Sequence, residues 1–151
     1  VLLIIFLGLW ISDSFIWHYS TLPGDVVPEY VRIGLAGLVL LSAWYLARGG
    51  MKAVFGTART EAGVINTGVF KLVRHPIYTG AILFYLGAIL ITLSIVSALF
   101  WLLIIAFYIL IARYEERILT EEFGQDYLNY KKKTGMLFPK ILIKILIKIF
   151  S

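Results

Sequence analysis

Residues 74–116 of the chain read RHPIYTGAILFYLGAILITLSIVSALFWLLIIAFYILIARYEE, and the 36 residues Ile77–Ala112 within this stretch carry no charge. A straight helix of that length would be about 54 Å long, whereas the hydrocarbon core of a membrane is roughly 30 Å thick. Polar threonine and serine side chains lie near the middle of the run, between positions 92 and 97. We therefore expect a helical hairpin with spans over about 77–93 and 98–112, whose two charged ends meet at the same membrane face.

The composition of the whole chain favours a membrane protein. Of its 151 residues, 60% are hydrophobic, and the mean hydropathy is +0.89. A small soluble domain leaves much of its surface in water and could not hide so much apolar area. We expect an all-α integral membrane protein in which residues 1–151 form a single membrane domain.

Several classes of site are disfavoured by what the chain lacks. It has no cysteine, which excludes disulfides, thiolate nucleophiles and cysteine metal sites. Its two histidines, His18 and His75, lie far apart in the sequence, so no metal site is expected. The net charge of +5 gathers at the predicted membrane borders, where orientation and anionic lipids explain it better than nucleic acid does.

Two further spans are expected before the hairpin, over about 1–17 and 30–47. The first contains Asp13 and begins within an apolar run, so a signal peptide and a first, trimmed span remain alternatives. The loop 18–29 holds no lysine or arginine, whereas residues 48–75 hold five against one acid. By the positive-inside rule, we expect a multi-pass protein with this basic segment and both termini in the cytoplasm.

The polar sequence after the hairpin predicts two more helices. Residues 113–130 mix acids with aromatic residues and predict an amphipathic helix. Further on, Lys140, Lys144 and Lys148 recur every fourth residue among isoleucine and leucine. This basic stripe is typical of a helix lying on anionic membrane lipids; a disordered tail and a packing helix are the alternatives.

The hairpin begins with a motif that could bind a ligand. Pro76 disfavours helical geometry at His75 and suits the first turn of the helix that follows. His75 should therefore lie beside the free N–H groups and positive dipole end of that helix, with Tyr78 one turn further on. The alternative is an ordinary membrane border, in which these residues face headgroups.

The end of the hairpin carries Glu115 and Glu116, with Arg113 and Arg117 beside them. One interpretation is a solvated helix with ion pairs between its own residues, such as Arg113 with Glu116. The other is that a carboxylate turns inward toward a ligand and an arginine turns toward an anionic substrate. The residues alone leave both interpretations open.

Sequence on both sides of the predicted hairpin resembles a known superfamily. Residues 67–80, TGVFKLVRHPIYTG, and the later blocks EERIL at 115–119 and FGQDYLNY at 123–130 are similar to isoprenylcysteine carboxyl methyltransferases and phospholipid methyltransferases, prokaryotic members in particular. The resemblance runs from about Glu61 to Pro139. It implies a methyltransferase that uses S-adenosylmethionine and acts on a lipid or prenylated-cysteine carboxylate entering from the bilayer.

The resemblance also implies roles for particular residues within cofactor segments 54–80 and 113–139. Arg113 or Glu116 would align the acceptor, which makes these two the candidate catalytic residues. The arginine that the family places one turn before the glutamate is Ile111 here, so either Arg113 replaces it or the acceptor is not a carboxylate. The candidate cofactor-binding residues are Ala62, Gly63, Val64, Ile65, Phe70, His75, Pro76, Ile77, Tyr78 and Glu115.

The proposed methyl transfer makes few demands on the protein, and other functions compete with it. Methyl transfer from a sulfonium needs positioning and a dry site rather than a protein nucleophile or a metal. Val64–Ile65 and Val69–Phe70 are candidates for short extended stretches, with a plain loop as the alternative. Competing functions are an NADPH-dependent sterol-reductase-like enzyme, a phospholipid N-methyltransferase and a non-catalytic membrane scaffold.

Overall fold

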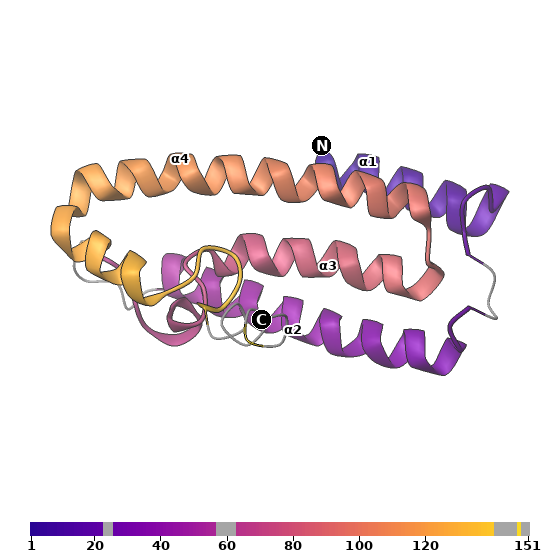
Figure 1. Cartoon of the computed structure of the whole chain (residues 1–151), viewed down its shortest axis with the longest axis horizontal. Helices are drawn as coiled ribbons and strands as arrows, with labels where there is room; N and C mark the ends of the chain where they lie inside the picture. The colour runs from indigo at the N-terminus through magenta and orange to yellow at the C-terminus, as the bar shows by residue number, and fades with distance from the viewer. Residues whose placement is uncertain (23–25, 57–62, 141–147, 149–151) are drawn as a thin grey trace. The chain divides into compact units, whose positions relative to one another are not determined.

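A computed structural model of the chain describes residues 1–22, 26–56, 63–140 and 148, and these residues form helices and connecting segments with no strand among them (Figure 1). The predicted all-α class is confirmed. The chain divides into two compact units, Val1–Trp44 with Ala81–Phe107 and Tyr45–Gly80 with Tyr108–Ser151. The elements are α1 (Leu2–Ile11), the π-helix η1 (Ser12–Trp17), α2 (Glu29–Phe55), the 3-10 helix η2 (Gly68–Lys71), α3 (Pro76–Thr92) and α4 (Ile95–Lys133).

In the first unit, α3 and α4 are antiparallel and joined by a tight turn at Leu93 and Ser94 (Figure 1). Ser94 caps α4, because its Oγ accepts a hydrogen bond of 3.2 Å from the backbone N–H of Ser97. Across the hairpin, the Trp101 indole donates a 2.9 Å hydrogen bond to the carbonyl of Ile82. The helical hairpin predicted from the uncharged run is therefore present.

Asp13, which interrupts the first predicted span, is fully buried and well bonded. Its carboxylate accepts hydrogen bonds from the backbone and hydroxyl of Ser20, at 2.7 and 2.5 Å, and from the hydroxyl of Ser94 at 2.5 Å. The Ser20 hydroxyl also accepts from the backbone N–H of Val96. Because a buried carboxylate is costly without such donors, Asp13 ties the first turn of η1 to Ser20 and to Ser94 at the start of α4.

The second unit is held together by close backbone approaches. A Cβ at Gly49 would lie 2.7 Å from the Val69 side chain of η2, and one at Gly50 would lie 2.7 Å from the Ile77 side chain of α3. An isolated parallel bridge joins Val73 to Gly135. The end of α2 thus packs directly on η2 and on the first turn of α3, which is possible only because glycine has no side chain.

Local structure around the basic segment differs from the sequence-based expectation. α2 continues to Phe55 rather than ending near residue 47, so the first part of the basic segment is helical. Val69 and Phe70 lie in η2, so they form neither the extended stretch nor the plain loop that the sequence left open. Gly68, at φ 57°, turns the chain into η2, whose hydrogen bonds run from Phe70 to Thr67 and from Leu72 to Val69.

The helix predicted over 113–130 is the continuation of α4, which runs to Lys133 with non-helical angles inside it at Gly124 (φ 52°, ψ −123°). Only a glycine adopts this conformation without strain. The basic helix predicted at the end of the chain lies almost wholly outside the described residues.

α2 and α4 are long and apolar enough to cross a membrane, and the shorter helices Leu2–Trp17 and Pro76–Thr92 are also apolar. Only 17% of the most apolar window in α2 and in α4 is buried. Large side chains such as Leu38, Leu103 and Leu110 are about 65% exposed. A core helix of a soluble protein would bury this surface, so these helices are suited to contact with lipid.

Candidate active site

The site is built on the first turn of α3, in the second unit. Pro76 begins the helix, as predicted, where its missing N–H costs nothing. His75 stands just before it; its backbone N–H donates to the Met136 carbonyl at 3.1 Å, and its own carbonyl accepts from Thr79 at 3.0 Å. His75 is 7% exposed, so both its backbone and its ring are fixed by the surrounding chain.

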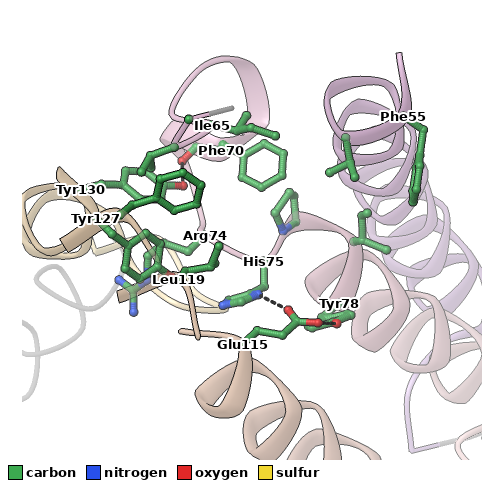
Figure 2. A pocket seen from close by; sticks show the side chains of 16 residues that line it. Phe55, Ile65, Phe70, Arg74, His75, Tyr78, Glu115, Leu119, Tyr127 and Tyr130 are labelled. Atoms are coloured by element: carbon green, nitrogen blue, oxygen red, sulfur yellow. Dashed lines mark hydrogen bonds and ion pairs between the residues drawn. The ribbon is translucent and has the colours of Figure 1, made fainter. Parts of the chain in front are cut away.

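Two carboxylates from α4 lie on either side of the His75 ring. Nδ1 is 3.4 Å from Oε2 of Glu115, and Nε2 is 3.5 Å from Oε1 of Glu116. The Tyr78 hydroxyl donates to Oε1 of Glu115, and the Tyr78 ring stacks on that of His75 with centroids 5.5 Å apart and planes at 2°. Figure 2 shows the Glu115 carboxylate directed at both side chains.

Glu116 belongs to a buried ion-pair network. Its Oε1 lies 2.6 Å from Nε of Arg74, and its Oε2 lies 2.8 Å from Nζ of Lys131. Arg74 also donates to the carbonyl of Thr134 and, at 3.2 Å, to that of Lys131. Burial alone would raise the pKa of Glu116, but hydrogen bonding to His75, Arg74 and Lys131 outweighs it and lowers the pKa to about 2.

A cavity of about 350 Å³ opens beside these groups, which is within the usual size range of small-molecule sites. Its described lining is mostly apolar and aromatic, and Glu115 is the one acid within it. In Figure 2, Phe70, Tyr127 and Tyr130 form a wall apart from the Glu115 carboxylate. The lining residues are Val54, Phe55, Gly63, Val64, Ile65, Phe70, Arg74, His75, Pro76, Ile77, Tyr78, Glu115, Leu119, Phe123, Tyr127 and Tyr130.

The tyrosines of this wall differ in their bonding. The Tyr130 hydroxyl donates to the Phe70 carbonyl at 2.7 Å, and burial raises the pKa of Tyr130 to about 12, so the hydroxyl stays protonated. Tyr127 has a buried hydroxyl with no hydrogen-bond partner among the described residues. A buried polar atom without a partner is uncommon and leaves hydrogen-bonding capacity for a ligand.

The structure brings together most of the predicted cofactor residues. Ala62 lies outside the described residues. The two candidate catalytic residues do not line the cavity: Arg113 is exposed, and Glu116 is bound by Arg74 and Lys131. The predicted cofactor residues that do line it are Gly63, Val64, Ile65, Phe70, His75, Pro76, Ile77, Tyr78 and Glu115.

Sequence reasoning missed one wall of the cavity. Leu119 and Phe123 follow Glu115 along α4 at four-residue intervals, so these three residues share one helical face, whereas Tyr127 and Tyr130 lie beyond the break at Gly124. Counting forward from Glu115 at helical spacing would have found Leu119 and Phe123. Arg74 and the α2 residues Val54 and Phe55 carry no comparable signal, since only the folded chain brings them to the cavity.

Comparison with known proteins assigns the chain to a family. A sequence profile of the phospholipid methyltransferase family matches residues 30–126. A methanethiol S-methyltransferase of Pseudomonas deceptionensis is 29% identical over 150 residues, covering 93% of this chain and 56% of that protein. One from Pseudomonas sp. (strain GM41(2012)) is 36% identical over 73 residues, 48% of this chain and 27% of that protein.

The chain thus spans about half the length of the first of these relatives, and no solved structure matches it. The profile covers well over half of the chain and includes both the His-Pro motif and Glu115, which line the cavity. The chain belongs to the phospholipid methyltransferase family.

Proposed function

We propose that the chain is an S-adenosylmethionine-dependent membrane methyltransferase whose donor binds in the cavity at the start of α3. The observation that carries the proposal is the convergence of the family's two sequence blocks on this one cavity. Family membership supports methyltransferase activity. The identity of the donor, the identity of the acceptor and the orientation in the membrane are our proposals.

The residues present fit this donor. Aromatic rings attract a cation such as a sulfonium through their faces, and Phe70, Tyr78, Phe123, Tyr127 and Tyr130 all line the cavity. Glu115 supplies one negative charge within this aromatic lining. When bound, the donor supplies an electrophilic methyl group, and the protein's part is to position the reactants and exclude water.

We propose a small thiol as the acceptor. Both relatives described above are methanethiol S-methyltransferases. Position 111 holds isoleucine, so the cavity side of α4 lacks the arginine that a carboxylate acceptor would pair with. A lipid or prenylated-cysteine carboxylate, with exposed Arg113 as its partner, and a phospholipid amine are the alternatives.

We also propose that the protein crosses the membrane several times with the cavity at the cytoplasmic face. The basic residues of segments 48–75 and 113–140 support this orientation, because positive charge is retained on the cytoplasmic side. The donor would then enter from the cytosol, and a lipophilic acceptor would enter from the bilayer. Cysteine-accessibility labelling at Lys71 and at Tyr19 would test the orientation.

The test of the donor is calorimetric titration of the purified, detergent-solubilised protein with S-adenosylmethionine and, separately, NADPH. We expect micromolar binding of S-adenosylmethionine that is lost in His75→Ala. The matched control is His18→Asn, because His18 is the chain's other histidine, is exposed, and has a φ of 51° that asparagine tolerates. Binding of NADPH instead would favour a reductase, and binding of neither would favour a scaffold.

The acceptor is tested by supplying methanethiol, a prenylated-cysteine carboxylate and phosphatidylethanolamine to the protein with isotope-labelled donor. We expect label in the thioether product. Label only in the methyl ester or only in the methylated amine would replace the thiol with that acceptor while retaining the donor.

A further inference from the structure

We propose that Glu115 is the general base that removes the proton from a thiol acceptor, with His75 and Tyr78 as its positioning residues. This inference rests on the proposed function. It gives Glu115 a role in the chemistry beyond the donor contact that the family resemblance implies.

A thiol acceptor needs a base. The cysteine thiol has a pKa of about 8.5, and a simple alkyl thiol is a still weaker acid, so both are largely protonated at neutral pH, whereas the thiolate is the nucleophile. A site that takes its substrate from water at neutral pH must therefore deprotonate it or wait for the minor ionised fraction. A carboxylate acceptor has no such requirement, so a base in the cavity distinguishes the two substrate classes.

Glu115 is placed to act as that base. It is the one acid among the described residues that line the cavity. Its Oε1 accepts from the Tyr78 hydroxyl, and its Oε2 lies 3.4 Å from Nδ1 of His75, so the carboxylate is held from both sides. His75 is buried and stacked on Tyr78, whose ring lies 5.2 Å from that of Tyr108. A base held by fixed neighbours keeps its geometry through the proton transfer.

Glu116 is excluded from the same role. It is 3% exposed, does not line the cavity and is occupied by Arg74 and Lys131. The Glu115 side chain is 41% exposed, which gives the proton a route to water. Glu116 therefore has a structural role in the ion-pair network, whereas Glu115 can accept a proton from a substrate in the cavity.

In the proposed step the thiol gives its proton to Glu115 and receives the methyl group of the donor. The S–H bond of the thiol breaks, and its proton forms an O–H bond with the Glu115 carboxylate. The sulfur keeps the electron pair and uses it to form a C–S bond with the methyl group as the methyl–sulfonium bond of the donor breaks. The donor sulfur takes that electron pair and becomes a neutral thioether, and Glu115 releases its proton to water.

The experiment compares wild type, Glu115→Gln and the control Glu121→Gln across a series of alkyl and aryl thiols of increasing acidity. For alkyl thiols we expect Glu115→Gln to lower the single-turnover rate by about 10²- to 10⁴-fold, the usual effect of a general base. The loss should shrink steadily as the thiol becomes more acidic. Glu121 is 67% exposed on the same helix, and its variant should match wild type. A Glu115→Gln protein that loses the same factor with every thiol would overturn the proposal.

Failure of this proposal and failure of the proposed function give different results. If wild type binds no S-adenosylmethionine, the donor assignment fails. If it binds the donor and methylates only a carboxylate or an amine, the donor assignment stands and the thiol base is overturned. Titration of Glu115→Gln with the donor separates the two roles of Glu115. Loss of donor binding, together with an equal loss of rate for every thiol, would show that Glu115 only binds the donor and is not the base.

Discussion

Replacing Glu116 by glutamine removes the charge that neutralises Arg74 and Lys131 in the second unit. The glutamine has nearly the same shape, so the change isolates the electrostatic contribution of the carboxylate. We expect the free energy of unfolding to fall by about 3 kcal/mol at neutral pH, close to what is usually lost when one partner of a buried ion pair is removed.

The magnitude follows from the pKa of Glu116. Its lowering from 4.5 to about 2 corresponds to about 3 kcal/mol, because each pKa unit is worth about 1.4 kcal/mol. A carboxyl whose pKa is lower in the folded state stabilises the fold above its unfolded pKa and loses that effect as the pH falls through the folded pKa. The difference between wild type and Glu116→Gln should therefore be constant above pH 4.5 and shrink toward pH 2.

The assay is thermal unfolding in detergent, followed by tryptophan fluorescence at several pH values. For a chain of this size a change of about 3 kcal/mol lowers Tm by roughly 6–12 °C. The matched control is Glu121→Gln, which breaks the exposed ion pair with Arg117 and should cost less than about 1 kcal/mol. A Glu116→Gln protein within 1 °C of wild type at pH 7, or a deficit equally large at pH 2, would refute the reasoning.

Three further substitutions probe the packing. Asp13→Ala should lower Tm by several degrees, because it leaves buried donors unpaired at the start of α4. Gly50→Ala should lower the free energy of unfolding, since its Cβ would lie 2.7 Å from the Ile77 side chain of α3. Gly34→Ala, whose Cβ would meet nothing within 4 Å, should raise the free energy of unfolding by about 0.5–1 kcal/mol. Urea unfolding would compare the two variants. Tyr130→Phe should cost about 1 kcal/mol by freeing the Phe70 carbonyl, again read from Tm.

Features set by neighbouring residues were predictable from the sequence. Pro76 begins α3 because proline restricts the residue before it and fits the first turn of a helix. The hairpin follows from an uncharged run that is too long for one crossing and has polar residues at its middle. In both cases the deciding interaction is local, so the sequence carries it directly.

Features set by distant residues were not predictable. Glu116 has Arg113 and Arg117 close by in sequence, yet its partners are Arg74, 42 residues away, and Lys131. The 3-10 conformation at Phe70 accompanies a hydrogen bond from Tyr130, 60 residues later. Charge and periodicity cannot choose among several plausible partners, whereas the folded chain admits only those that its backbone brings within reach.

The hydrogen bonds between residues 134–136 and the start of α3 have a consequence for biosynthesis. Arg74 and His75 donate their backbone N–H groups to the carbonyls of Gly135 and Met136, and the Arg74 side chain bonds the Thr134 carbonyl 60 residues later in the chain. A nascent chain still ending before these residues has the His-Pro motif but no acceptors for its polar groups. The cavity can therefore form only after residues 134–136 have been synthesised, and a chain truncated before Thr134 should not be retained on immobilised S-adenosylhomocysteine, the product of the proposed donor.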